Sequence, residues 1–160
     1  MTITIRPAQH DDAHDIMDIA VDSNMFLPEE LTGVGEMLDT WLDNAAEPGH
    51  EWIVLDDNGT IKGAAYYAIE TMADNVWNVF FIAVKAEQRR CGVASQMITF
   101  IEQAVKDRGG RIVLIETSSN AQFEPARQCY LKLNFTHEGT IRQFYGDTED
   151  KMVFWKSLAG

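Results

Sequence analysis

The alternation of hydrophobic and polar positions divides the chain into strands and helices, and one stretch organises the rest. Residues 76–84 form an almost wholly apolar run, a short polar turn follows, and apolar side chains then recur at helical spacing as far as Val105. An apolar run of this length between polar turns is typical of a buried strand, and the later spacing predicts a helix with one face on a sheet. Gly109 and Gly110 predict the end of that helix.

The rest of the pattern predicts an α/β fold with a mixed, mostly antiparallel sheet of about seven strands and four helices. The strands over 76–84 and 111–117 are joined by a helix, so they should run parallel through a right-handed crossover. Residues 56–59 contain Asn-Gly between two strands, which predicts a hairpin. The other expected strands are 2–6, 52–55, 61–69, 135–144 and 151–156, and the other expected helices are 11–20, 28–44 and 125–133.

Composition and charge narrow the class of protein. At 160 residues, with 46% hydrophobic residues and no apolar run of membrane-spanning length, we expect one globular domain over residues 1–160. The net charge of −12 argues against nucleic acid and anionic membranes as partners. Met1–Thr4 shows no basic segment before an apolar one, and the two cysteines lack paired spacing, so we predict a cytoplasmic protein.

The turn between the central strand and its helix has the chemistry of an anion site. The first backbone N–H groups of a helix have no internal partners and lie at the positive end of the helix dipole. Gly92 allows a phosphate to approach the backbone closely, and Ala94 keeps the next contact small. Arg89 and Arg90 add positive charge in an otherwise acidic protein. We therefore predict a pyrophosphate-binding site here.

This turn and a second segment resemble the GNAT superfamily of acyl-CoA-dependent N-acyltransferases. The superfamily signature is Gln or Arg, two residues, Gly, one residue, then Gly or Ala, and residues 89–94 read Arg-Arg-Cys-Gly-Val-Ala. Residues 126–135, Ala-Arg-Gln-Cys-Tyr-Leu-Lys-Leu-Asn-Phe, are similar to its second landmark. The resemblance covers nearly the whole chain. It implies a single-domain GNAT-like fold with a splayed parallel pair of strands, and acetyl-CoA as the co-substrate.

The resemblance also implies where acetyl-CoA binds. A bulge in the central strand is expected to free the backbone N–H of Ile82 for the thioester oxygen, with Val84 pairing the pantetheine arm. Backbone donors fixed in place before reaction act as an oxyanion hole. The expected cofactor-binding residues are Ile82, Ala83, Val84, Arg89, Arg90, Cys91, Gly92, Val93, Ala94, Ser95, Asn120 and Tyr130.

An acid and a base complete the expected catalytic groups. Tyr130 stands where the superfamily has its acid, and a phenol with a pKa of about 10 stays protonated at neutral pH yet can protonate a leaving thiolate. Some members of the superfamily have a glutamate at the position of Asn78 that acts as the general base. The amide of Asn78 cannot act as a base. Glu116, acting through water, is our first candidate for the general base, and Glu70 is the second. Tyr130, Glu116 and Ile82 are thus the predicted catalytic residues.

The acceptor site is expected to combine aromatic and charged side chains. Aromatic faces attract ammonium groups, and an arginine suits a carboxylate. The expected acceptor therefore includes an amino acid or a related amine. The predicted substrate-binding residues are Phe26, Glu70, Trp77, Asn78, Arg142 and Tyr145.

We expect an N-acetyltransferase that moves the acetyl group directly to a primary amine of a small molecule in a ternary complex. Direct transfer follows because neither cysteine has a histidine partner in its sequence context and no serine elbow motif is present. Two alternatives stay open: a protein N-terminal or lysine acetyltransferase, and a non-catalytic CoA-binding regulatory domain. No metal is expected, because His10 and His14 have Asp where a zinc-protease motif needs Glu. A homodimer stays open as the oligomeric state.

Overall fold

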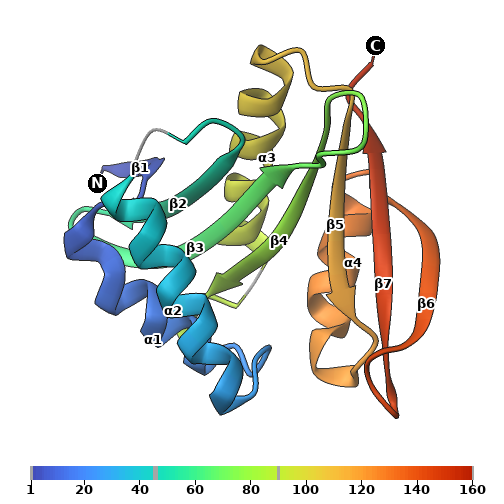
Figure 1. The fold of residues 1–160 in the computed structure, drawn as a ribbon, viewed down its shortest axis with the longest axis horizontal. Helices are drawn as coiled ribbons and strands as arrows, with labels where there is room; N and C mark the ends of the chain where they lie inside the picture. The colour runs from blue at the N-terminus through green and yellow to red at the C-terminus, as the bar shows by residue number, and fades with distance from the viewer. Residues whose placement is uncertain (1, 45–46, 90, 160) are drawn as a thin grey trace. The chain divides into compact units, whose positions relative to one another are not determined.

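The described strands form one mixed sheet in the order β1-β2-β3-β4-β5-β7-β6 (Figure 1). The computed structural model describes residues 2–44, 47–89 and 91–159. The strands are β1 (Ile3–Pro7), β2 (His50–Asp57), β3 (Thr60–Ile69), β4 (Val76–Val84), β5 (Ile112–Ser118), β6 (Thr136–Gly146) and β7 (Glu149–Ser157). The α-helices are α1 (Ala13–Asp22), α2 (Pro28–Asp43), α3 (Cys91–Asp107) and α4 (Glu124–Lys132), with 3-10 turns η1 (His10–Asp12), η2 (Ala86–Gln88) and η3 (Ala121–Phe123).

This architecture confirms the predicted α/β class, with a seven-stranded mixed sheet and four helices. The domain organisation is a separate question, because the chain divides into two compact units. The first holds the chain up to Tyr67 together with Phe81–Met97. The second holds Ala68–Phe80 and the chain from Ile98 onward. A single domain over residues 1–160 therefore stays a prediction.

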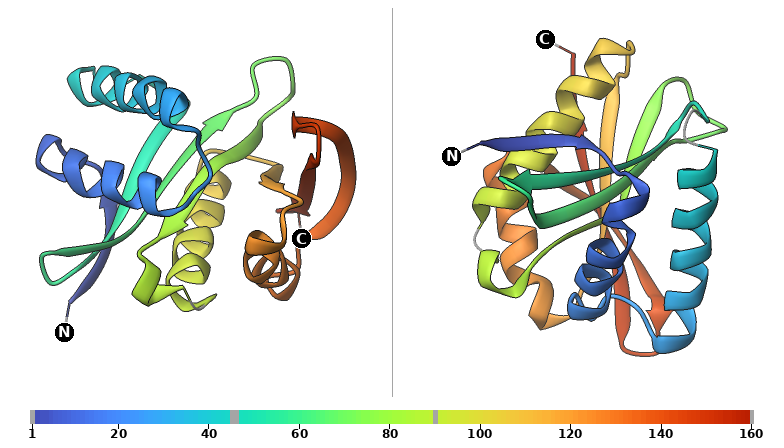
Figure 2. Two further views of the ribbon diagram at one scale, coloured as in Figure 1. Left: turned by 90° about the horizontal axis from the view of Figure 1, so that it is seen from below. Right: turned by 90° about the vertical axis from the view of Figure 1, so that its left-hand side faces the viewer.

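In the first unit, helices cover both faces of the strands. Helices α1 and α2 lie on one face of β2 and β3, and the start of α3 lies on the other (Figure 2). Apolar side chains at helical spacing make the contact on the first face, since Ile16 and Ile19 of α1 and Leu38 of α2 are fully buried. On the second face α3 approaches β3 closely: a Cβ on Gly63 would lie 2.7 Å from Met97 Sδ. Glycine at this position lets the helix lie against the strand.

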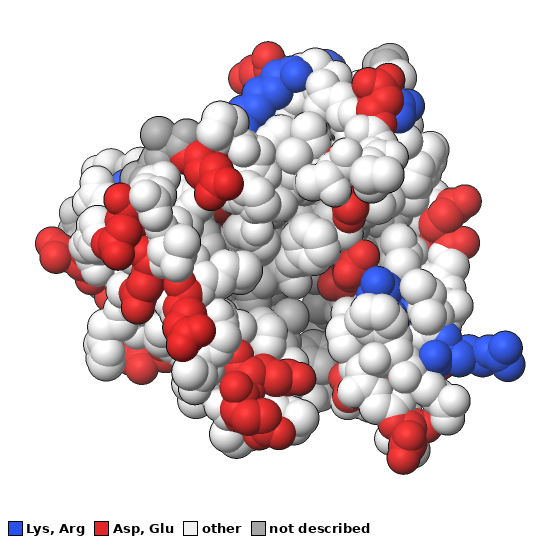
Figure 3. Space-filling model, viewed as in Figure 1, with Lys and Arg blue, Asp and Glu red and all other residues white. Residues whose placement is uncertain are grey.

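The outer surface of α2 is acidic. Acidic side chains follow the length of this helix (Figure 3), and its exposed members are Glu29, Glu30, Glu36, Asp39 and Asp43. Such a surface repels a phosphate backbone, in line with the net charge of −12. No helix in the described part of the chain is both long and apolar enough to cross a membrane.

In the second unit, β5 is the central strand. It runs parallel to β4 over Val76–Val79 and Ile112–Ile115, and antiparallel to β7 over its whole length. The parallel pairing of β4 and β5 confirms the prediction that two strands joined by a helix run parallel here. The ladder between β4 and β5 ends after four residue pairs although both strands continue.

Strand β4 contains one residue more than β3 between the hydrogen bonds at their two ends. The Glu70 N–H donates to the Val76 carbonyl at 2.8 Å, and the Lys85 N–H donates to the Lys62 carbonyl at 2.9 Å. Eight residue steps separate Lys62 from Glu70, whereas nine separate Val76 from Lys85. One extra residue on one strand of an antiparallel pair is a β-bulge. The count agrees with the bulge that the resemblance implies for this strand.

Candidate active site

The turn after β4 leaves free space around Gly92, the residue predicted to contact a phosphate. Gly92 is exposed in the first turn of α3, and a Cβ built on it would meet no atom within 4 Å. Packing therefore does not require glycine at this position, whereas close approach of a ligand to the helix N-terminus would. Val93, Ala94 and Ser95 are half-buried in the same turn. The residues present fit an anionic group such as the diphosphate of coenzyme A.

Arg89 holds the turn in place through the backbone. Its Nη2 donates to the Asp22 carbonyl at 2.7 Å, and its Nε donates to the Val84 carbonyl at 3.3 Å. The exposed guanidinium therefore ties the end of β4 to the end of α1 and keeps a positive charge beside the turn. Arg90 lies outside the described residues, as does the side chain of Cys91.

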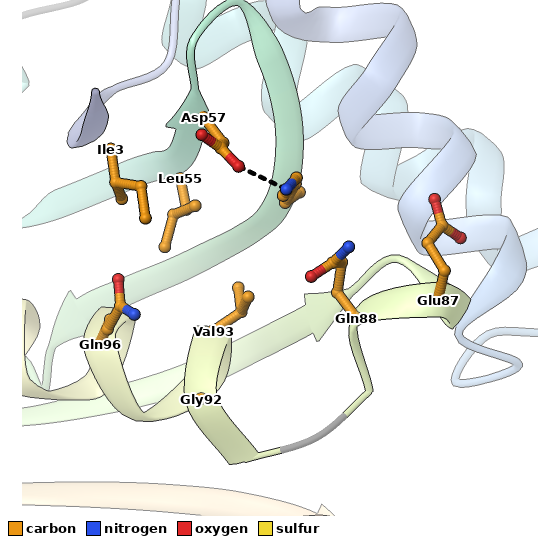
Figure 4. A pocket seen from close by; sticks show the side chains of 9 residues that line it. Ile3, Leu55, Asp57, Glu87, Gln88, Gly92, Val93 and Gln96 are labelled. Atoms are coloured by element: carbon orange, nitrogen blue, oxygen red, sulfur yellow. Dashed lines mark hydrogen bonds and ion pairs between the residues drawn. The ribbon is translucent and has the colours of Figure 1, made fainter. Parts of the chain in front are cut away.

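A cavity of about 330 Å³ lies between the start of α3, η2 and the hairpin of β2 and β3 (Figure 4). Its charged lining residues are Asp57, Lys62 and Glu87, and Asp57 forms an ion pair with Lys62. Two carboxylates against one ammonium make this lining unfavourable for a diphosphate. Gly92 and Val93 also line this cavity, and its two acidic residues come from the hairpin and from η2.

The expected thioester contacts lie at the end of β4. Ile82, Ala83 and Val84 are half-buried, while Phe81 just before them is buried. Phe81 packs against Phe26, with ring centroids 5.7 Å apart, and against Trp52 at 5.9 Å. The predicted substrate contact Phe26 therefore lies in an aromatic cluster of the first unit.

Tyr130 is buried in the second unit, near the end of α4. It is 4% exposed, and its ring packs edge-on against Phe154 at 5.5 Å between centroids and against Phe135 at 6.5 Å. Burial raises the pKa of the Tyr130 phenol well above its ordinary value of 10. The hydroxyl therefore stays protonated at physiological pH, as a general acid must before it acts. Asn134 follows α4 with a φ of 71°, the left-handed conformation with which many helices end.

Arg127 is a site residue that the sequence analysis did not single out. It is 7% exposed, and its Nη1 donates to the Ser118 carbonyl at 2.6 Å and the Asn120 carbonyl at 3.0 Å. Its Nη2 donates to Glu124 Oε2 at 2.7 Å. The guanidinium thus fixes the loop that contains Asn120, a predicted cofactor contact, to the helix that carries Tyr130. Arginine is rarely buried, so nothing in a single sequence marks this one as internal.

Replacing Arg127 with methionine should destabilise the protein by about 2–4 kcal/mol, because the change leaves two carbonyl oxygens without their charged donor. The matched control is Gln128→Met, which removes a polar group from the next, exposed residue of the same helix. This control should cost less than about 0.5 kcal/mol. Urea denaturation measures both values. Equal midpoints for the two variants would show that the Arg127 contacts do not hold the loop.

The two candidate bases meet on one amide. Asn78 Nδ2 donates to Glu70 Oε1 at 2.9 Å and to Glu116 Oε2 at 2.8 Å. Asn78 is fully buried in β4, whereas both glutamates are partly exposed. Glu116 is the first residue of β5 beyond the ladder with β4. The structure therefore brings together three predicted residues, of which Glu116 lies 38 positions from Asn78 in the sequence.

Lys151 and Tyr145 lie beside Glu116. Lys151 Nζ is 3.4 Å from Glu116 Oε2, and it sits 3.9 Å from the centre of the Phe144 ring. Burial, together with the negative charges of Glu116 and Glu149, raises the pKa of Tyr145 to about 12. The charge of Glu116, a predicted base, thus contributes to the raised pKa of Tyr145, a predicted substrate contact.

The pKa of Tyr145 predicts how stability depends on pH at the alkaline end. Its ordinary pKa of 10 becomes about 12 in the folded state, so the folded state retains a proton that the unfolded state has lost. Its contribution to stability should be present below pH 10 and should be lost as the pH rises to about 12. Tyrosinate absorbance of the wild type minus that of Tyr145→Phe isolates this titration. Glu116→Gln should lower its midpoint, whereas Glu138→Gln, at an exposed position of β6, should not.

The remaining predicted substrate contacts differ in exposure. Trp77 is 3% exposed, its Nε1 donates to Asn75 Oδ1 at 2.9 Å, and the Arg108 guanidinium lies 5.2 Å from its ring centre. Arg142 is exposed on β6, in a segment where the register with β7 shifts. The structure thus turns Trp77 toward the interior of the second unit and Arg142 toward solvent. Their roles toward a substrate stay predictions.

Comparison with known proteins gives the fold independent support. A GNAT-family protein from Desulfovibrio desulfuricans superposes with a TM-score of 0.89 at 23% identity, over 99% of this chain and 100% of that one. A Salmonella typhimurium protein, assigned as an acetyltransferase and solved with its cofactor acetyl-CoA, gives 0.79 at 15% identity, over 100% and 96%. The ribosomal-protein-S18-alanine N-acetyltransferase of Escherichia coli gives 0.77 at 18% identity, over 99% and 96%.

Because these sequence identities are low, the similarity to the solved structures shows a shared fold only. No curated protein matches the chain. The model of the acetyltransferase (GNAT) family, in contrast, matches residues 13–135, which is well over half of the chain. This protein therefore belongs to the GNAT family of acetyltransferases.

Proposed function

We propose that the protein transfers the acetyl group of acetyl-CoA directly to a primary amine of a small molecule, in a ternary complex. The observation that carries the proposal is the contact of Glu70 and Glu116 with the buried amide of Asn78. An amine with a pKa near 10 arrives protonated, so the reaction needs a group that takes its proton. The partly exposed Glu116 supplies a carboxylate for this step.

Acetyl-CoA, when bound, supplies the activated acetyl group as a thioester. The amides around Gly92 would bind its diphosphate, and Val84 would pair with its pantetheine arm. The N–H of Ile82 would donate to the carbonyl oxygen and stabilise the charge that develops there. These residues bind and orient the thioester without contributing a covalent step.

Glu116, directly or through one water, accepts the proton of the substrate ammonium, which frees the nitrogen lone pair. The nitrogen then forms a bond to the carbonyl carbon and releases its second proton to solvent, as the carbon–sulfur bond breaks. Tyr130 donates its proton to the leaving sulfur and regains one from solvent. Products are the acetylated amine and free coenzyme A, so protons and electron pairs balance.

Thiol release from acetyl-CoA in the presence of a panel of small amines and short peptides tests the proposal. We expect release with small amines and intersecting lines in initial-velocity plots, as a ternary complex requires. Release with peptides alone would favour the protein acetyltransferase alternative. Acetyl-CoA binding without release for any acceptor would favour a regulatory domain. The cytoplasmic location and the homodimer remain predictions from the sequence.

A further inference from the structure

The carboxylates of Glu70 and Glu116 are joined by a neutral group, the side-chain amide of Asn78. An amide that donates to two carboxylates holds them in place but carries no charge of its own to compensate theirs. Both oxygens contact the same nitrogen, at 2.8 and 2.9 Å, so they lie within reach of a single ammonium group. Within the described residues, the hydrogen bonds from Asn78 use only one oxygen of each carboxylate, Glu70 Oε1 and Glu116 Oε2. The pair therefore has acceptor capacity available on its exposed side.

The charge around this pair is negative. Lys151 contacts Glu116, but Glu149 adds a third carboxylate nearby, where it accepts a hydrogen bond from Ser118. Three carboxylates against one ammonium leave an excess of negative charge. The pKa of Tyr145 is raised mainly by burial, and the charges of Glu116 and Glu149 add to the shift in the same direction. A ligand that carries a carboxylate of its own would be repelled here.

A buried acceptor without a donor lies at the base of the pair. Asn78 is 0% exposed, and its Oδ1 has no hydrogen-bond partner within the described part of the chain. Its Nδ2 reaches both glutamates, so the side chain is directed into the cluster. Buried polar atoms are normally paired, and this cluster has more acceptors than donors. An ammonium group, with three N–H donors and a positive charge, supplies what the cluster lacks.

Lys151 shows that the surroundings accept an alkylammonium group. Its Nζ lies between Glu116, at 3.4 Å, and the face of Phe144, at 3.9 Å from the ring centre. Phe144 and Tyr145 are 54% and 45% exposed, with ring centroids 5.1 Å apart. They offer further aromatic surface beside the carboxylates. A second alkylammonium, from a substrate, would find the same combination of contacts.

From these contacts we propose that Glu70 and Glu116 select a cationic acceptor, a diamine or similar alkylamine without a carboxylate. Glu70 binds the ammonium, and Glu116 takes the proton. The proposal rests on the proposed function for its acetyl-transfer step. It also departs from the sequence-based expectation of an amino acid, because Arg142, the residue expected to bind a carboxylate, is exposed on β6.

The test compares 1,5-diaminopentane with lysine, which is the same chain carrying an added carboxylate. We expect kcat/KM for the diamine to exceed that for lysine at least about tenfold, the factor that one favourable charge contact gives. Glu70→Gln should raise KM for the diamine about tenfold while kcat changes less than about twofold, because a binding contact is lost and the base is kept. Glu138→Gln removes the same charge from an exposed site and should behave as the wild type.

Two results would overturn the proposal while leaving acetyl transfer intact. One is equal kcat/KM for lysine and the diamine, and the other is a Glu70→Gln variant indistinguishable from Glu138→Gln. If no amine releases thiol, the proposed function fails, and calorimetry of 1,5-diaminopentane binding decides the inference by itself. Binding about tenfold weaker in Glu70→Gln than in the wild type would uphold it. Equal binding in the two proteins would refute it.

Discussion

Replacing Tyr130 with phenylalanine should lower kcat about 100- to 1000-fold, the range that a general acid contributes. The dissociation constant of acetyl-CoA should stay within about twofold, because only one hydroxyl is removed and the ring remains. The pKa of this phenol is raised by burial, so it is fully protonated at neutral pH and holds the proton that the leaving thiolate needs. Steady-state kinetics and equilibrium binding of acetyl-CoA give the two quantities.

A second variant separates the hydroxyl of Tyr130 from its ring. Tyr130→Leu also removes the contacts with Phe135 and Phe154, so it should lower the melting temperature where Tyr130→Phe does not. If the hydroxyl is the acid, both variants lose kcat to a similar extent despite their different stabilities. Equal losses of kcat and of acetyl-CoA affinity in Tyr130→Phe would instead show that the residue positions the cofactor.

Elements whose periodicity is local were predicted well from the sequence. Strand β4 begins and ends where the apolar run over 76–84 does, and the buried face of α3 contains Met97, Ile98, Ile101 and Val105, all at helical spacing. Strand β2 is longer than the predicted 52–55. Its polar end, Asp56 and Asp57, pairs with Thr4 and Ile3 of β1, and this pairing extends the strand beyond its apolar part. Partners distant in the chain decide such ends.

The sequence predicted individual residues of the site, but it did not predict the hydrogen bonds that join them. Glu70 and Glu116 were expected as alternative bases, and Asn78 as a residue unable to replace the usual glutamate. That its amide links the two depends on a contact between residues 38 positions apart, which no local pattern encodes. The register shift of β6 between Ile141 and Gly146, with Gln143 at a φ of 57°, was likewise not predicted. Its residue types read as an ordinary strand, and pairing with β7 decides the irregularity.

Replacing Gly92 with valine should raise the dissociation constant of acetyl-CoA at least about 100-fold, because side-chain atoms would occupy the space through which a phosphate approaches the helix amides. The fold should tolerate the change, since a Cβ at this position meets no atom within 4 Å. Gly92→Ala gives a sharper test. It should stabilise the protein by about 0.5–1 kcal/mol, as alanine does in place of an unstrained helical glycine. The same variant should nevertheless weaken binding.

Helix α2 provides the matched control for Gly92. Gly33 is also an exposed helical glycine whose Cβ would meet no atom within 4 Å. Gly33→Ala should therefore stabilise the protein to a similar degree without changing acetyl-CoA affinity. Calorimetric binding and urea denaturation of the four proteins separate the two effects. If Gly92→Val binds acetyl-CoA as the wild type does, the diphosphate is not held by these amides. If both alanine variants are more stable and only Gly92→Ala binds weakly, glycine is needed at position 92 for a ligand rather than for the fold.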